Sequence, residues 1–86
     1  MKLALITGAT KGIGRSTAQT FAKAGWNLIL LGRDIQKLQD LKNQLSNTGV
    51  QINILAFDLS QSDKVDQYVN QCIKSYGCPT VVINNA

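Results

Sequence analysis

The chain has 86 residues, 44% of them hydrophobic, and a formal net charge of +4. This composition suits one small globular domain, and the scattered basic residues do not form the patch that nucleic-acid binding requires. No apolar run is long enough to span a bilayer, so we expect a cytoplasmic protein that binds neither nucleic acid nor membrane. The two cysteines, Cys72 and Cys78, lack metal-ligand spacing and the sequence has no histidine, which predicts reduced thiols and no metal site.

The first predicted strand is the apolar run at residues 3–6, and it leads into a glycine-rich turn at residues 7–14. The turn reads T-G-A-T-K-G-I-G and opens onto a helical pattern that begins near Gly12. Glycines let a backbone approach an anion closely, and a helix N-terminus offers it unpaired N–H groups. We therefore predict a phosphate-binding turn, in preference to an ordinary strand-to-helix turn with incidental glycines.

The first helix carries residues at helical spacing that form a predicted apolar stripe: Ile13, Thr17, Phe21 and Ala24. Gly25 then stands where a C′ glycine ends a helix. A second strand follows at residues 27–31. Its continuous apolar run is typical of a strand that is covered on both faces.

The second helix follows a turn at Gly32 and Arg33, and Asp34 is placed to cap its N-terminus. Its predicted apolar stripe consists of Ile35, Leu38, Leu41 and Leu45. Its predicted solvent face consists of Lys37, Asp40 and Lys42. Residues 47–49 end this helix.

A third strand is predicted over residues 50–57, which alternate and then run apolar. A third helix follows, with Ser60 as its N-cap and Asp63 in its first turn. Its apolar stripe consists of Val65, Val69, Cys72, Ile73 and Tyr76. Cys72 is therefore expected to be a buried core residue rather than a nucleophile. Residues 77–79 break the helix, and residues 80–83 form a fourth strand.

The resulting pattern is β-α-β-α-β-α-β with short connections. Right-handed crossovers then predict an α/β fold of the Rossmann type: a truncated, doubly wound parallel sheet with strand order 3-2-1-4. We expect residues 1–86 to form a dinucleotide-binding half-domain that is incomplete at its C-terminus. The first two helices should cover one face and the third helix the other, which leaves the fourth strand as an open edge and apolar residues of strands 1 and 4 facing water. We expect the isolated chain to be marginally folded or to associate through that edge.

In this fold the ligand lies beyond the carboxyl ends of the strands, where Lys11, Arg15 and Arg33 are expected. Arg33 lies roughly 20 residues beyond the turn, where NAD-binding chains carry an acidic residue for the ribose 2′-OH. A guanidinium there matches a 2′-phosphate instead. Asp34 fits a helix cap better than a ribose contact, and Lys11 either reinforces the phosphate preference or is a solvated loop residue.

The third and fourth strands end in further candidate residues. Asp58 either accepts a hydrogen bond from the adenine amino group, with the Leu59 backbone beside the ring, or is an ordinary turn residue. After the fourth strand, the amides of Asn84 and Asn85 can bridge strand ends. The backbone at Ala86 can border the cofactor ribose.

These motifs, in this order, resemble the short-chain dehydrogenase/reductase family, and the likeness covers the whole chain. The family carries a T-G-x-x-x-G-x-G turn, a basic residue after strand 2, D-L or D-V after strand 3 and N-N-A-G after strand 4. Members with basic residues at the places of Lys11 and Arg33 usually prefer NADPH. The resemblance therefore implies NADP(H) rather than NAD(H) as cofactor. The implied cofactor-binding residues are Gly8, Thr10, Lys11, Gly12, Ile13, Gly14, Arg33, Asp58, Leu59, Asn85 and Ala86.

The chain departs from the family's pattern after Ala86, where the glycine of N-N-A-G is absent. The family's catalytic serine and Tyr-x-x-x-Lys lie further on. In this sequence Tyr68 and Tyr76 are followed four residues later by Cys72 and Thr80, so no catalytic residue is predicted within the chain.

The resemblance implies a fragment, the N-terminal cofactor half of an NADPH-dependent reductase of 3-oxoacyl groups or small ketones and aldehydes. It should be inactive alone. The complete protein is expected to bind a small carbonyl substrate and to form a homo-oligomer. The rival hypothesis is a non-catalytic nucleotide-binding module or a truncated gene product. An unrelated domain of the flavodoxin type would not explain the third and fourth motifs.

Overall fold

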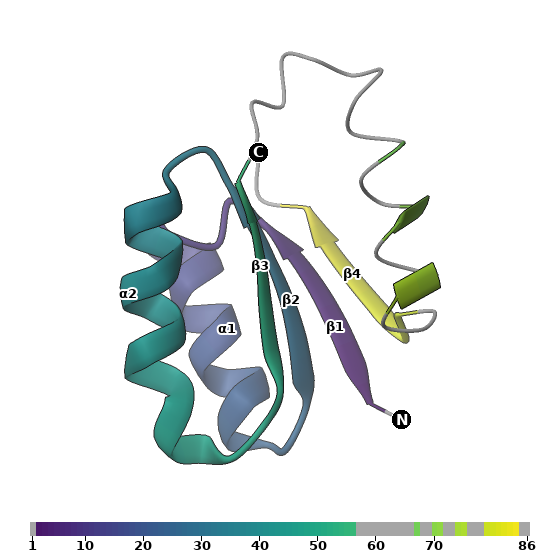
Figure 1. The fold of residues 1–86 in the computed structure, drawn as a ribbon. Coiled ribbons are helices and arrows are strands. Elements are labelled where there is room, and N and C mark those ends of the chain that lie inside the picture. The colour runs from purple at the N-terminus through teal and green to yellow at the C-terminus, as the bar shows by residue number, and fades with distance from the viewer. Residues whose placement is uncertain (1, 57–66, 68–69, 72–73, 76–78, 85–86) are drawn as a thin grey trace.

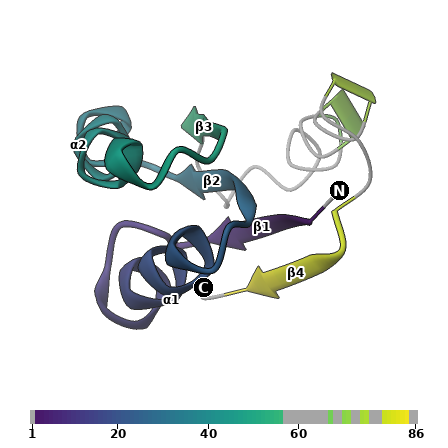
Figure 2. The same cartoon turned by 90° about the horizontal axis from the view of Figure 1, so that it is seen from below.

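The computed structural model describes residues 2–56, 67, 70–71, 74–75 and 79–84. It confirms the predicted fold class: the described strands form one parallel sheet in the order β3-β2-β1-β4, with both described helices on the same face (Figure 1, Figure 2). The elements are β1 (Leu3–Thr7), α1 (Gly12–Lys23), β2 (Asn27–Gly32), α2 (Ile35–Leu45), a 3₁₀ turn (Ser46–Thr48), β3 (Ile52–Ala56) and β4 (Val81–Asn84).

The register of the sheet brings the ends of three strands to one level. β1 is flanked by β2 and β4, and Thr7 at its end pairs with Leu31 on one side and with Asn84 on the other. All strands run in the same direction, so β1, β2 and β4 end at the same edge of the sheet (Figure 1). The strand order reverses at β1, which makes this edge the switch point of the fold.

The strands differ slightly from their predicted bounds, and β1 and β2 each end one residue later, at Thr7 and Gly32. β3 begins at Ile52 rather than at Val50, and the N–H of Gln51 donates to the Asn27 side-chain oxygen at 2.9 Å instead of to a strand carbonyl. β4 begins one residue later than predicted, at Val81. None of these shifts alters the order of the strands.

Helix α1 packs on the sheet through small residues. The predicted stripe is wrong at its two ends, because Ile13 is 77% exposed and Ala24 is exposed as well. Between them, Phe21 is partly buried and packs against the core. Hydrophobic spacing singles out bulky side chains, whereas a helix that lies close to a sheet needs small ones at the contact. Gly25, with a φ of 88°, follows the end of the helix as predicted. The buried positions are Gly14, Ala18 and Ala22.

Helix α2 covers β2 and β3 on the same face. Asp34 caps its N-terminus as predicted, since its carboxylate accepts from the N–H groups of Gln36 (3.0 Å) and Lys37 (3.3 Å). The first position of the predicted stripe is wrong, because Ile35 is 54% exposed. The remaining stripe is buried and consists of Leu38, Leu41 and Leu45. The predicted solvent face, Lys37, Asp40 and Lys42, is exposed.

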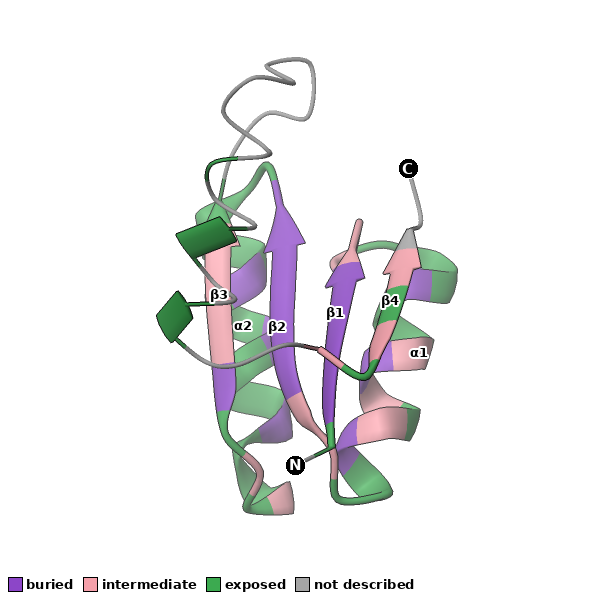
Figure 3. Ribbon diagram, turned by 90° about the vertical axis from the view of Figure 1, so that its right-hand side faces the viewer, coloured by how far each residue is buried: buried purple, intermediate pink, exposed green. Residues whose placement is uncertain are grey.

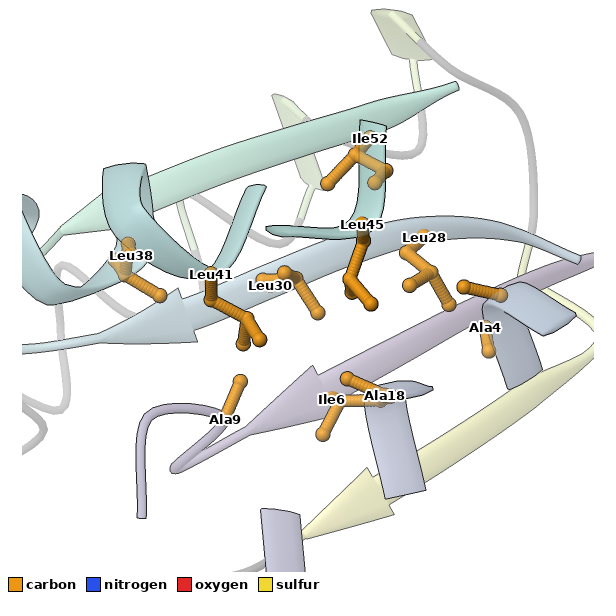
Figure 4. Close-up of a cluster of buried hydrophobic side chains, with 11 residues drawn as sticks. Ala4, Ile6, Ala9, Ala18, Leu28, Leu30, Leu38, Leu41, Leu45 and Ile52 are labelled. Carbon is orange, nitrogen blue, oxygen red and sulfur yellow. The ribbon is translucent and has the colours of Figure 1, made fainter. Parts of the chain in front are cut away.

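The core lies on both faces of β1 and β2. On the helical face, side chains from these strands meet the leucines of α2, as Figure 4 shows for Ile6, Leu30 and Leu41. On the other face a second cluster consists of Leu3, Leu5, Ile29 and Leu31, packed with Leu55. β2 is therefore buried on both faces as predicted.

The same clusters correct the prediction that apolar residues of the first strand face water. Leu3 and Leu5 are each only 3% exposed. At the edge strand β4, in contrast, Val82 is 62% exposed, as predicted. Figure 3 shows that part of β4 is exposed. Among the described strands β4 pairs with β1 alone.

The predicted third helix falls largely outside the described residues, including Ser60, Asp63 and the stripe that contains Cys72. The positions that the structure does describe there are helical and exposed: Gln67, Asn70, Gln71, Lys74 and Ser75. They lie across the sheet from α1 and α2 (Figure 1, Figure 3). None of the helices in the described part of the chain has the length and hydrophobicity needed to cross a membrane.

Candidate functional site

The glycine turn joins β1 to α1 at the switch point of the sheet. Gly8 and Gly12 have φ angles of 60° and 44°, a conformation that residues with side chains rarely adopt. A Cβ atom added to Gly12 would meet no atom within 4 Å, so the space beside it is open. Ala9 fixes the turn to the sheet: it is fully buried, and its N–H donates to the Leu31 carbonyl at 3.3 Å.

Gly14 is needed for a different reason, the contact between helix and turn. It is buried in the first turn of α1. A Cβ atom at this position would lie 2.9 Å from the carbonyl carbon of Gly8 and closer still to the carbonyl oxygen. Both atoms belong to the backbone and cannot swing aside, so Gly14 sets how closely α1 approaches the turn.

The N-terminus of α1 has no side-chain cap among the described residues. Its N-cap residue is Lys11, which forms no capping hydrogen bond, and the first turn contains no acidic residue. The N–H groups of Gly14 and Arg15 donate to the Lys11 carbonyl at 3.0 and 3.3 Å, whereas those of Gly12 and Ile13 have no backbone acceptor among the described residues. Free N–H groups at the positive end of a helix dipole can bind an anion.

Basic side chains near this N-terminus have different surroundings. The side chain of Lys11 is exposed and has no ion pair or hydrogen bond with a described residue. Arg15 lies in the first turn of α1, but its Nη2 donates to Gln44 Oε1 of α2 at 2.7 Å. The guanidinium of Arg15 therefore links the two helices, a role that the sequence did not indicate.

Arg33 follows β2 at the same edge of the sheet. It is exposed and forms no ion pair or hydrogen bond with any described residue. The neighbouring carboxylate of Asp34 is the N-cap of α2, as the sequence predicted. The only other carboxylate in the described part of the chain belongs to Asp40, which accepts from the Gln36 side chain at 3.2 Å.

An open groove of about 490 Å³ runs along α1 from the glycine turn. The hydroxyl of Thr17 donates to the Ile13 carbonyl at 2.7 Å, and that of Thr20 donates to the Ser16 carbonyl at 3.0 Å. These hydroxyl hydrogens are therefore used by the helix itself. Sequence reasoning missed the groove because it treated several of these residues as the inner stripe. The lining residues are Gly12, Ile13, Ser16, Thr17, Thr20 and Phe21.

The structure places part of the predicted site. The described members lie in the turn, at the start of α1 and after β2: Gly8, Thr10, Lys11, Gly12, Ile13, Gly14 and Arg33. Asp58, Leu59, Asn85 and Ala86 lie outside the described residues, so their roles stay predictions. The described residues contain no cluster of three potential metal-ligating side chains from His, Cys, Asp and Glu.

A parallel sheet in the order 3-2-1-4, with a glycine turn and an open helix N-terminus at its switch point, defines a Rossmann-type α/β protein. The model of the short chain dehydrogenase family matches residues 2–86. The chain therefore belongs to the short-chain dehydrogenase/reductase family of oxidoreductases, as the sequence motifs indicated.

The curated relatives include two enzymes with nearly the same sequence identity to this chain. A sulfoacetaldehyde reductase of Chromohalobacter salexigens is 42% identical over 81 residues, which are 94% of this chain and 32% of the relative. A 12alpha-hydroxysteroid dehydrogenase of a Clostridium species is 41% identical over 92 residues, which cover 99% of this chain and 36% of the relative. The chain thus spans about a third of the length of these relatives.

Solved structures show the same fold. An L-sorbose reductase of Gluconobacter frateurii, complexed with NADPH and L-sorbose, is 34% identical with a TM-score of 0.90, over 99% of this chain and 33% of the other. An alcohol dehydrogenase of the archaeon Thermococcus sibiricus, complexed with 5-hydroxy-NADP, is 31% identical with a TM-score of 0.88, over 95% of this chain and 35% of the other.

Proposed function

We propose that the chain is the cofactor-binding part of an NADPH-dependent oxidoreductase that reduces a carbonyl group to an alcohol. The observation that carries the proposal is the open N-terminus of α1 at the same sheet edge as Arg33. An NADP-type cofactor needs anion sites for its pyrophosphate and its 2′-phosphate. The cofactors in the solved relatives and the reductase and dehydrogenase names of the curated ones support this choice.

The residues of the turn fit the pyrophosphate. In this proposal the N–H groups of Gly12 and Ile13 donate to it, and the open space beside Gly12 gives it room. Gly8 and Gly14 keep the turn and the helix in place, while Thr10 and Lys11 border the bound anion. When bound, NADPH supplies a hydride to the substrate.

The remaining proposed contacts involve the ends of the other strands. Arg33 pairs with the 2′-phosphate through parallel N–H donors, a geometry that a guanidinium matches well. Asp58 and Leu59 are assigned to the adenine, and Asn85 and Ala86 to a ribose, by resemblance to the family.

Carbonyl reduction also needs a proton donor. The family uses the tyrosine of Tyr-x-x-x-Lys, and neither Tyr68 nor Tyr76 is followed by that lysine. We propose that the donor and the substrate-specificity residues belong to sequence outside these 86 residues, and we propose no particular substrate. The same observation favours one alternative, a module that binds the nucleotide without catalysis. Tyr-x-x-x-Lys in the coding sequence after Ala86 would support the enzyme, and a stop codon there would support the module.

The test is a titration of the purified protein with NADPH and with NADH, monitored by cofactor fluorescence. We expect NADPH to bind more tightly, and Arg33→Ala to lose about 1.5–3 kcal/mol of NADPH binding free energy with little change for NADH. Lys42→Ala removes an exposed cation from the last turn of α2 and is the matched control. An unchanged NADPH/NADH ratio in Arg33→Ala would remove Arg33 from the site, and binding of neither cofactor would refute the proposed function.

A further inference from the structure

Asp34 stands where its charge should oppose the proposed cofactor preference. NAD-binding chains carry an acidic residue about 20 residues beyond the glycine turn, where it accepts a hydrogen bond from the ribose 2′-OH. Here an acidic residue directly follows Arg33, which the proposed function assigns to the 2′-phosphate. A mobile carboxylate beside that phosphate would repel it and would favour NADH.

The structure gives this carboxylate another partner. Asp34 Oδ1 accepts from the N–H groups of Gln36 and Lys37 at 3.0 and 3.3 Å, and the Asp34 carbonyl accepts from the Leu38 N–H at 3.1 Å. Side chain and main chain thus both hold the first turn of α2. The helix is anchored in turn by Leu38, which is fully buried. The carboxylate is directed to the helix N-terminus, where the N–H groups and the helix dipole offset its charge.

Arg33 lies between two fixed backbone segments. On one side Gly32 ends β2 and pairs with Ala56 in the sheet. On the other side Asp34 has the extended conformation of an N-cap, with φ −105° and ψ 104°. Arg33 itself is exposed and has no hydrogen-bonding or ionic partner among the described residues. The cap therefore limits the backbone at Arg33 and keeps the Asp34 carboxylate from pairing with its guanidinium.

We propose that Asp34 is a positioning residue for cofactor specificity. By capping α2, Asp34 keeps its carboxylate away from the cofactor and fixes the backbone that presents Arg33. An acidic residue next to Arg33 is therefore compatible with the binding of a 2′-phosphate. This inference rests on the proposed function, because it concerns how the same site selects NADPH.

Three substitutions separate the cap from the charge. Asp34→Ser retains an N-cap residue without charge, so the NADPH/NADH affinity ratio should change by less than about twofold. Asp34→Glu retains the charge on a side chain that caps poorly. Its released carboxylate should lower the ratio by about two- to fivefold, the size of an exposed charge interaction. Asp40→Glu makes the same chemical change further along α2 and should leave the ratio unchanged.

The experiment measures NADPH and NADH dissociation constants by cofactor fluorescence for the parent and these variants, with thermal unfolding in parallel. Asp34→Glu should lower both the ratio and the unfolding temperature, and Asp34→Ser should preserve both. A merely structural cap would lower the unfolding temperature of Asp34→Glu and weaken both cofactors equally, which overturns the inference. A changed ratio in Asp34→Ser would also overturn it, because the carboxylate would then act on the cofactor directly.

The parent protein and Arg33→Ala separate this inference from the proposed function. If the parent prefers NADPH and Arg33→Ala abolishes the preference, the proposed function holds. An unchanged ratio in Asp34→Glu then refutes only the role of Asp34. If the parent binds neither cofactor, both proposals are wrong.

Discussion

Helices α1 and α2 begin at the same edge of the sheet, but their N-termini are built differently. Asp34 caps α2 and accepts from two of its backbone N–H groups. The N-cap of α1 is Lys11, whose side chain forms no capping bond, and the first turn of α1 also contains Arg15. Positive charge near the positive end of a helix dipole is unfavourable. Within the described part of the chain, one N-terminus is therefore capped by a side chain and the other has no such partner.

The two helices also differ in the side chains that hold them on the sheet. α2 is held by three buried leucines. α1 approaches the sheet through Gly14, Ala18 and Ala22, which bury little apolar area each and permit a close contact. The position of α1 thus depends on the fit of its backbone to the glycine turn. An anion bound at the turn would add to that fit, so we expect α1 to gain more stability from the proposed cofactor than α2.

The largest effect is expected where α1 touches the turn. Gly14→Val would place a β-branched side chain against the Gly8 carbonyl, and backbone atoms cannot move aside without displacing the helix. We expect a loss of about 3 kcal/mol or more of unfolding free energy, or no folded protein, with loss of NADPH binding. Denaturant unfolding and an NADPH titration measure both effects.

Gly32→Ala is the matched control for that substitution. Gly32 is also buried, but a Cβ atom there would lie 3.5 Å from a flexible Leu38 methyl group, which is an ordinary contact. We expect its unfolding free energy to stay within about 0.5 kcal/mol of the parent. Tight NADPH binding by Gly14→Val would contradict the turn as the phosphate site.

A smaller effect is expected at the capped helix. Asp34→Ala removes the acceptor for two N–H groups and should cost about 1 kcal/mol of unfolding free energy. Asp34→Asn keeps a capping oxygen and should recover most of this loss. Thermal unfolding of the two variants measures the difference. If Ala and Asn destabilised the protein equally, the contribution of Asp34 to stability would come from its charge and not from capping.

The sequence predicted those features of the fold that depend on local signals. Asp34 as a cap, Gly25 after the end of α1 and the apolar run of β2 each reflect the preference of a residue or a short segment, and the structure confirms them. The strand order was predictable because parallel crossovers share one handedness. The glycine turn was predictable as a motif, because few residue types tolerate its backbone angles.

The features that the sequence did not predict depend on tertiary packing. Ile13 has the hydrophobicity of a core residue and is exposed, while Gly14 beside it is buried, because closeness to the turn decides the inner face of α1. Leu3 is buried because both faces of β1 are covered, which periodicity cannot reveal. The contact of Arg15 with Gln44 joins residues 29 positions apart, and no local signal indicates it.

Lys11→Asp would give α1 the kind of cap that α2 already has. Lys11 has extended backbone angles, φ −125° and ψ 139°, which suit an N-cap aspartate. In Lys11→Asp the new carboxylate can accept from the N–H of Ile13, which has no acceptor among the described residues, and it complements the helix dipole. The unfolding free energy should therefore rise by about 0.5–1 kcal/mol. The same carboxylate occupies the proposed phosphate site, so NADPH should bind at least about tenfold more weakly.

Lys11→Ala removes the charge without adding a cap and should show the smaller loss of affinity and no gain in stability. Denaturant unfolding and NADPH titration of both variants measure the opposed changes, and a Lys11→Asp protein that bound NADPH as tightly as the parent would show that the anion lies elsewhere.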